Sequence, residues 1–207
     1  MSTDCYYAVK RGKQPGVYTS FLELKKSIEG CDFPLYKEFK SEKDAYDFLF
    51  GSFGLTKNKL GLYQELQLTK KYSSWPSTFV SYTDGSKKNN NSSYGFIGVV
   101  NNIIQYEEAN LIDQDNASHI VGEFEAVIRT IQHAVNNNFK RVFIFYDYAQ
   151  IREVLNYQGQ YDNECIQNYQ EFVYKQLSNI EIEFIKVKAH RGNQFNEYVN
   201  DLVKRIC

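Results

Sequence analysis

The second half of the chain alternates between two hydrophobic periodicities. Apolar runs typical of strands occur in TFVSYTDGS, YGFIGVVNN, NIIQYEEAN, RVFIFYDY and EIEFIKVKAH. Between and after them, apolar residues recur at helical spacing, first at Phe124, Val127, Ile128, Ile131 and Val135, then at Ile166, Tyr169, Val173 and Leu177, then within residues 195–206. The pattern predicts an α/β fold over residues 78–207, in which a mixed sheet carries helices on both faces. We expect a hairpin to turn at Asn101-Asn102.

A shorter unit occupies residues 5–50. CYYAVKRG and YKEFKS predict strands, KQPG predicts a turn, and residues 21–28 and SEKDAYDFLF predict two helices. Ser41, three residues before Asp44, resembles a capping box at the start of the second helix. We therefore expect a small α/β module within residues 1–52, before the larger domain at residues 78–207.

The stretch between these units, residues 53–77, has the composition of a linker. Gly, Ser, Lys, Gln and Asn dominate, and WPST closes the stretch. We expect a solvated tether with a short helix around residues 60–68. The alternative is that its lysines contact phosphates.

The charge balance is close to neutral, with 24 basic and 25 acidic side chains. This argues against a protein that coats nucleic acid by charge alone, although a local binding face remains compatible with it. The four cysteines lack CxxC spacing, and no histidine lies at zinc-finger distance from them. The first residues lack the apolar core of a signal peptide, and no apolar run approaches the length of a membrane span. We expect a soluble, cytoplasmic monomer with free thiols and no membrane partner.

Three acids occupy positions where chemistry is common. Asp84 follows a strand in YTDGS, Glu123 begins a helix in VGEFEA, and Asp147 ends the buried strand in FYDY. Each has a structural alternative, because Asp84 suits a turn, Glu123 complements a helix dipole and Asp147 can begin a loop. Together they would converge at one edge of a sheet. Carboxylates that close repel each other, and a divalent cation relieves the repulsion.

The segments FVSYTDGS, HIVGEFEAV, IFYDYAQI and VKAHRGNQFNEYVNDLVK resemble type 1 ribonuclease H, in the order and spacing of that family. The N-terminal YYAVKRGKQPGVYTSFLELKKSI, with YKEF and SEKDAYDFL, is similar to its hybrid-binding, viroplasmin-like domain. The resemblance implies a five-stranded sheet and hydrolysis of the RNA strand of RNA/DNA hybrids. It also implies two Mg²⁺ ions, for which Mn²⁺ can substitute. The N-terminal module is expected to bind hybrid, or double-stranded RNA, in preference to duplex DNA.

The resemblance also assigns the catalytic set. It implies that Asp84, Glu123 and Asp147 bind metal with a fourth acid on the last helix. It further implies that His190, in VKAHRG, assists proton transfer or product release. The alternative class is a non-catalytic hybrid-binding protein whose acids are structural.

The fourth acid is where the chain departs from the family. Aligned without a gap, that position falls on Asn200, and a one-residue insertion would place Asp201 there instead. The two residues lie about 115° and about 145° from the centre of the helix's apolar stripe, on opposite flanks, so they cannot share one site. We favour Asn200 as the fourth metal-site residue. Either the natural protein is a weakened homologue, or Asn200 replaces a natural Asp to stop cleavage.

The resemblance implies a nucleic-acid face on the N-terminal module, formed by Tyr7, Phe21, Tyr36 and Lys37. The family more often has Trp where Phe21 stands, and a basic residue where Glu38 stands. Further candidate contacts to the nucleic acid are Lys10, Arg11 and Lys13, which flank the turn, and Ser86 beside Asp84. The alternative is that the tyrosines fill a small core.

Overall fold

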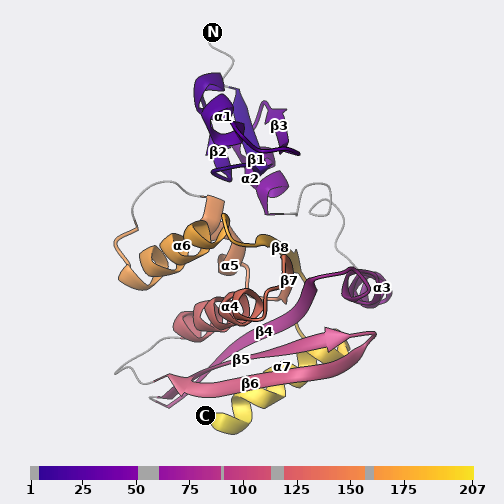
Figure 1. Cartoon of the computed structure of the whole chain (residues 1–207). Helices are drawn as coiled ribbons and strands as arrows, with labels where there is room; N and C mark the ends of the chain where they lie inside the picture. Colours follow the sequence, from indigo (N-terminus) through magenta and orange to yellow (C-terminus); the bar gives the residue numbers. More distant parts are fainter. Residues whose placement is uncertain (1–4, 51–60, 90, 113–118, 157–160) are drawn as a thin grey trace.

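The computed structural model describes residues 5–50, 61–89, 91–112, 119–156 and 161–207. The chain forms a small N-terminal module above a larger sheet domain (Figure 1). Among the described helices, none has the length and apolar character that crossing a membrane would require. All four cysteines fall within the described residues, and none of them forms a disulfide.

The larger domain is built on five strands in the order β6-β5-β4-β7-β8. They are β4 (Thr78–Lys88), β5 (Asn91–Val100), β6 (Ile103–Ile112), β7 (Arg141–Tyr146) and β8 (Glu181–Lys186). The first three pair antiparallel, whereas β4, β7 and β8 pair parallel. The predicted mixed sheet is confirmed. So is the hairpin, because Asn101 and Asn102 both take the positive φ angles of a tight turn between β5 and β6.

Helices cover both faces of this sheet. One face packs against α4 (His119–Asn136), α5 (Gln150–Glu153), the 3-10 turn η1 (Val154–Asn156) and α6 (Glu164–Gln176). The other packs against α7 (Gln194–Ile206) and α3 (Leu62–Ser73). Side chains of strand β7 point alternately to the two faces of the sheet. Val142 and Ile144 face the first group of helices, and Phe143 and Phe145 face the second. Figure 1 shows α4 and α7 on opposite sides of the sheet.

The N-terminal module is a three-stranded antiparallel sheet with two helices. Its strands are β1 (Tyr6–Arg11), β2 (Gly16–Tyr18) and β3 (Leu35–Phe39), in the order β2-β1-β3. Its helices are α1 (Phe21–Ile28) and α2 (Glu42–Leu49). The Ser41 side chain accepts a hydrogen bond from the Asp44 amide at 3.4 Å, as the capping pattern predicts. Strand β2 was not predicted, because three residues are too few to show a periodicity.

Helix α3 differs from the solvated tether expected between the two units. Its Tyr72 ring stacks on Phe143 at 3.8 Å between centroids, and Leu66, Leu68 and Trp75 pack against the same cluster. Residues 51–60 lie outside the described part of the chain. The helix runs further than expected because Tyr72 extends its apolar side beyond residue 68, and Trp75 follows just after its end.

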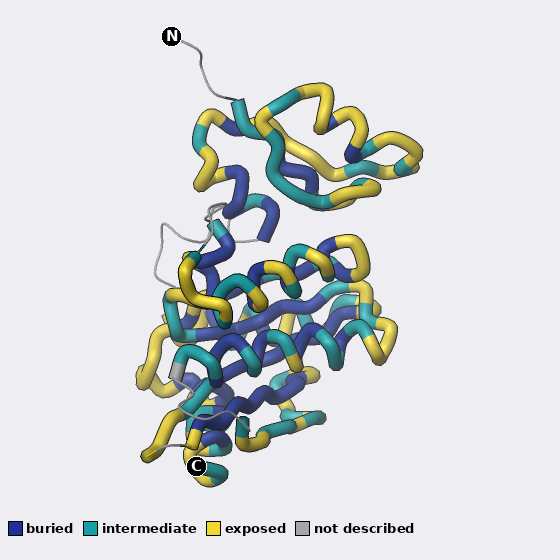
Figure 2. The backbone as a smooth tube through the Cα atoms, turned by 90° about the vertical axis from the view of Figure 1, so that its left-hand side faces the viewer, coloured by how far each residue is buried: buried dark blue, intermediate teal, exposed yellow. Residues whose placement is uncertain are grey.

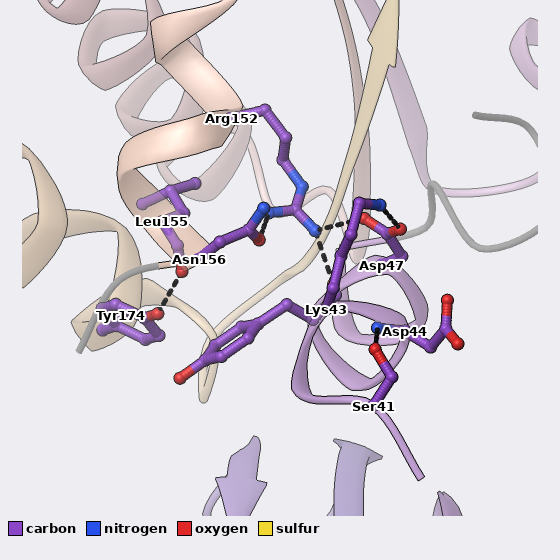
Figure 3. Close-up of polar contacts among 9 residues, drawn as sticks. Ser41, Lys43, Asp44, Asp47, Arg152, Leu155, Asn156 and Tyr174 are labelled. Carbon is purple, nitrogen blue, oxygen red and sulfur yellow. Dashed lines mark hydrogen bonds and ion pairs between the residues drawn. The ribbon is translucent and has the colours of Figure 1, made fainter. Parts of the chain in front are cut away.

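The N-terminal module is docked on the larger domain at the edge strand β8. Phe50 is fully buried in the main core, and its carbonyl accepts a hydrogen bond from the Phe184 amide at 3.0 Å. Arg152 reaches across from α5, donating to the Tyr46 carbonyl at 2.7 Å and pairing with Asp47 at 3.3 Å (Figure 3). Figure 2 shows that the end of the module nearest the larger domain is coloured as buried. The exposed edge of β8 is thereby covered.

Candidate active site

Two glycines bring the first two acids together. A Cβ atom on Gly85 would lie 2.3 Å from the Glu123 amide nitrogen, and one on Gly122 would lie 2.4 Å from the Ser93 carbonyl oxygen. Helix α4 therefore approaches β4 and β5 more closely than any side chain would allow. The close contact places Glu123, in the second turn of α4, beside Asp84 on β4.

The position of Asp84 corrects one expectation. Strand β4 does not end at Asp84, because pairing with β5 continues from Asp84–Gly95 to Lys88–Asn91. Gly85 is needed for the approach of α4 rather than for a turn. Asp84 is consequently held within a strand that stays paired with β5 both before and after this residue.

The three acids converge on one small volume. Oxygen atoms of Asp84, Glu123 and Asp147 all lie within 4.8 Å of one another. Asp84 and Glu123 are buried, and Asp147 follows the end of β7 at intermediate exposure. The Gly85 amide donates to Asp84 Oδ1 at 2.9 Å, but Asp84 Oδ2 and Glu123 Oε2 are buried without a hydrogen-bond partner. Orphaned carboxylate oxygens are costly unless a cation or a proton satisfies them.

The electrostatics of the cluster reflect this crowding. Burial raises the pKa of Asp84 to about 7, and the Asp147 carboxylate adds to the rise. The hydrogen bond from the Gly85 amide and the nearby Glu123 and Asn200 side chains oppose it. Burial, followed by the charges of Asp84 and Asp147, also raises the pKa of Glu123 well above its ordinary value. Without a cation, burial and crowding therefore favour the protonated forms of Asp84 and Glu123.

Helix α7 supplies two neutral amides to the same site. The Asn200 side chain lies near enough to Asp84 to lower the pKa of that carboxyl, and it is at intermediate exposure, whereas Asp201 is exposed. The structure thus places Asn200, which the ungapped alignment selects, at the site and leaves Asp201 in solvent. One turn earlier, Asn196 donates from Nδ2 to Asp147 Oδ2 at 2.9 Å. The sequence analysis missed Asn196, although its spacing of four residues from Asn200 was the available signal.

The residues present fit a divalent cation. Hard cations such as Mg²⁺ prefer carboxylate oxygens, and three carboxylates meet here with two orphaned oxygens. The Oδ1 atom of Asn196 is also buried without a partner. A bound cation would satisfy these atoms and favour the ionised form of each acid.

His190 lies apart from the cluster in the loop between β8 and α7. It is exposed and has a positive φ angle of 50°, and Gly192 follows with a φ angle of 81°. The loop places the imidazole in solvent. A catalytic role for His190 stays a prediction.

The aromatic residues expected to bind nucleic acid share one side of the N-terminal module. The Tyr7 and Phe21 rings lie 5.9 Å apart between centroids. Tyr36 pairs with Val9, two residues from Tyr7, so their side chains share that face of the sheet. Phe21 is 55% exposed and Tyr36 is 46% exposed. Both rings are accessible to a ligand rather than buried in a core.

The basic residues expected at this face do not all lie on it. Lys37 is exposed, but it pairs with Ala8, so its side chain leaves the sheet on the face opposite Tyr7 and Tyr36. Its Nζ atom lies 5.5 Å from the centroid of the Phe39 ring. Lys10 forms an ion pair with Glu183 of β8, with 10% of its side chain exposed. The structure therefore does not place Lys10 where it could contact phosphates, because docking of the module uses its charge.

The remaining candidates are accessible to different degrees. Arg11 pairs with Glu181 at 3.5 Å while staying about half exposed, and Lys13 is exposed in the turn. Ser86 lies on β4 two residues beyond Asp84, at intermediate exposure. It is therefore the candidate contact nearest in the chain to the acids.

Comparison with solved structures identifies the fold. The RNase H1 of the halophilic archaeon Halobacterium salinarum NRC-1 is similar with a TM-score of 0.52 and 16% identity, over 62% of this chain and 98% of that chain. LC11-RNase H1, isolated from compost, has a TM-score of 0.51 at 16% identity, over 62% of this chain and 97% of that one. A foamy-virus protease-reverse transcriptase, solved with an RNA/DNA hybrid, has a TM-score of 0.50 at 18% identity, over 61% and 19%. At these identities the likeness establishes the fold.

Family models cover most of the chain. Residues 5–49 match the Ribonuclease H1 N-terminal domain, and residues 76–207 match RNase H. No curated protein matches the chain. The RNase H match spans more than half of the sequence and contains all three converging acids, so this chain belongs to the RNase H family.

Proposed function

We propose that the chain hydrolyses the RNA strand of RNA/DNA hybrids with two divalent cations, Mg²⁺ in nature and Mn²⁺ as a substitute. The observation that carries the proposal is the cluster of Asp84, Glu123 and Asp147, which holds two orphaned carboxylate oxygens in a chain of the RNase H family. Bound cations there would activate water for in-line attack on the phosphodiester and stabilise the leaving 3′ oxygen.

The protein's own residues have separable parts in this chemistry. Asp84 and Glu123 would hold the cations from the buried side, where the contact between Gly85 and Gly122 fixes the spacing of the two acids. Asp147 reaches the same point from the end of β7, oriented by the Asn196 amide. Because these groups are fixed by backbone pairing and burial, little reorganisation is needed when substrate binds.

The N-terminal module would hold the hybrid. Its exposed Phe21 and Tyr36 rings form a surface on which sugars or bases can pack, and Arg11 of the same module stays half exposed. The wide, shallow minor groove of an RNA-containing duplex suits such a surface better than B-form DNA does. Double-stranded RNA is the second ligand that this face would accept.

A non-catalytic function has one observation in its favour. Asn200 stands where the family pattern has a fourth acid, and its side chain lies near Asp84. A neutral amide contributes less to holding a cation than a carboxylate does. The chain as written would then bind hybrid and cleave it slowly.

Titration calorimetry distinguishes the two functions. The protein is titrated with Mg²⁺ and with Mn²⁺, in the presence and absence of hybrid, alongside Asp84→Asn. The enzymatic site requires that Asp84→Asn weaken metal binding in the presence of hybrid. Unchanged metal affinity would mean that the acids are structural. Parallel titrations with hybrid, double-stranded RNA and duplex DNA establish the preference of the binding face.

A further inference from the structure

Helix α3 lies outside both stretches that match a family model. Those stretches are residues 5–49 and 76–207, and α3 spans Leu62–Ser73. It nevertheless packs beside α7 on one face of the catalytic sheet, with the Tyr72 ring stacked on Phe143. An added helix on this face could serve stability alone, so its polar contacts decide whether it does more.

Two polar residues of α3 are buried against the domain. Glu65 is 3% exposed, and its Oε2 atom accepts a hydrogen bond from Asn193 Nδ2 at 2.7 Å. Thr69 is fully buried, donates to the Glu65 carbonyl at 2.9 Å and lies 2.7 Å from the Tyr82 hydroxyl. Burying a carboxylate on an added helix is costly, so its partner has to be a specific one.

That partner is the residue that begins α7. Asn193 is the N-cap of this helix, and its Oδ1 atom accepts from the Phe195 amide at 3.1 Å and the Asn196 amide at 3.4 Å. Its Nδ2 atom donates to Glu65 and, at 3.4 Å, to the Tyr82 hydroxyl. Both polar atoms of the Asn193 side-chain amide are therefore hydrogen-bonded. Nδ2 binds Glu65 of α3 and Tyr82 of β4, and Oδ1 binds the first backbone amides of α7.

The hydrogen-bond directions in this group are mutually consistent. Burial raises the pKa of Tyr82 to about 12, so its hydroxyl keeps its proton and can donate to Thr69. Thr69 in turn donates to the Glu65 carbonyl, which leaves the Tyr82 oxygen to accept from Asn193. A reversed Asn193 amide would point an oxygen at the Glu65 carboxylate. Glu65 thus selects the amide orientation that caps α7.

We infer that Glu65 is a positioning residue for the active site, acting through Asn193 on the start of α7. The same helix carries Asn196, which hydrogen-bonds Asp147, and Asn200, whose side chain lies near Asp84. Displacing the first turn of α7 would therefore move both amides relative to the acids. As far as it concerns catalysis, this inference rests on the proposed metal site.

The test compares Glu65→Gln, which retains an acceptor oxygen, with Glu65→Met, which retains the volume without one. Both are made in the full chain, with Gln67→Met as the control at an exposed position of α3. Amide hydrogen exchange is measured at Phe195 and Asn196, and Mn²⁺ is titrated in the presence of hybrid. Glu65→Met should speed exchange at these two amides by about tenfold and weaken Mn²⁺ binding by a similar factor, whereas Glu65→Gln should restore both.

Two results would overturn the inference. One is a Glu65→Met protein that melts earlier but keeps native exchange at Phe195 and Asn196 and native Mn²⁺ binding, which would make α3 a stabilising element alone. The other is a Glu65→Gln protein as impaired as Glu65→Met, which would exclude the hydrogen bond as the cause. Faster exchange in Glu65→Met, rescued by Gln, in a protein whose parent binds no metal would support the positioning of α7 and refute the proposed function instead.

Discussion

Asn196 donates a hydrogen bond from Nδ2 to Asp147 Oδ2 at 2.9 Å, and this bond joins α7 to the end of β7. Asp147 is the least buried of the three acids, and it follows its strand rather than lying within it. Its carboxylate therefore depends on α7 for its orientation more than Asp84 does. The Oδ1 atom of the same Asn196 amide is buried without a hydrogen-bond partner.

We expect Asn196→Leu to impair metal binding while leaving the fold intact. Leucine fills a similar volume, but it cannot orient Asp147. Loss of an outer hydrogen bond to a metal-binding residue typically costs about 10–100-fold in metal affinity or activity. Mn²⁺ titration in the presence of hybrid measures the effect, and Asp201→Asn on the exposed side of α7 is the control. Equal affinities in the two variants would show that Asn196 does not orient the site.

Gly122→Ala should both destabilise the protein and separate Asp84 from Glu123. The new Cβ atom would meet the Ser93 carbonyl at 2.4 Å and Gly85 Cα at 3.1 Å, and both are backbone atoms with little room to move. We expect a loss of about 1–3 kcal/mol in the free energy of unfolding, together with weaker metal binding. Urea unfolding measures the first effect.

Gly61→Ala is the matched control for this change. A Cβ atom at Gly61 meets nothing closer than 3.9 Å, and the residue has a φ angle of −86°. Its effect should stay below about 1 kcal/mol. A Gly122→Ala protein that unfolds and binds metal like this control would refute the close approach of α4 to β4.

The raised pKa of Asp84 predicts how metal-free stability changes with pH. Because burial raises this pKa from 3.8 to about 7, the folded protein binds the proton more tightly than the unfolded chain between those values. The stability contributed by Asp84 is therefore present at low pH and is lost as pH rises through about 7. Asp84→Asn keeps an acceptor for the Gly85 amide but has no proton to lose.

Urea unfolding in a chelating buffer at about pH 5 and about pH 8 measures this difference. Between the two conditions, Asp84→Asn should lose less stability than the parent, by on the order of 2 kcal/mol. Asp201→Asn, at an exposed position, should follow the parent. Parallel losses in the parent and Asp84→Asn would contradict the buried, crowded state of the acid.

Phe21→Ala should weaken binding to RNA/DNA hybrid. The ring is 55% exposed beside Tyr7, so its removal costs little stability but takes away a packing surface. We expect a loss of about 1–3 kcal/mol in binding free energy. Tyr63→Ala is the control, because Tyr63 is 74% exposed on α3, outside the module. Fluorescence anisotropy with a labelled hybrid measures both variants, and indistinguishable affinities would remove Phe21 from the binding face.

The sequence predicted the elements whose residues repeat with a clear period. The strand RVFIFYDY and the helix marked by Phe124, Val127 and Ile131 are long and regular, so they appear in the structure as β7 and α4. Asp147 follows the end of β7 as predicted, and Glu123 lies near the start of α4, whereas Asp84 lies within β4 rather than at its end. Their convergence could be expected because family motifs fixed the order of the elements.

The parts that were not predicted depend on contacts between distant segments. The ion pair between Lys10 and Glu183 joins the first strand of the chain to the last, and no local pattern distinguishes such a lysine from one that binds phosphate. The same holds for Glu65, whose hydrogen-bond partner Asn193 is 128 residues away in the sequence. Asp84 seemed to end its strand because Asp-Gly is a frequent turn, whereas here the glycine serves the approach of a helix.

The most direct test of the account is cleavage of a labelled RNA strand within a hybrid, followed on a gel in Mg²⁺. Asn200→Asp places a carboxylate beside Asp84, so it should raise the cleavage rate by on the order of a hundredfold over the parent. Adding Asp84→Asn to that variant should abolish the gain, and Asp201→Asn should change little because Asp201 is exposed. A parent chain that is already fully active and is inactivated by Asp201→Asn would contradict the assignment. So would cleavage that persists without Asp84.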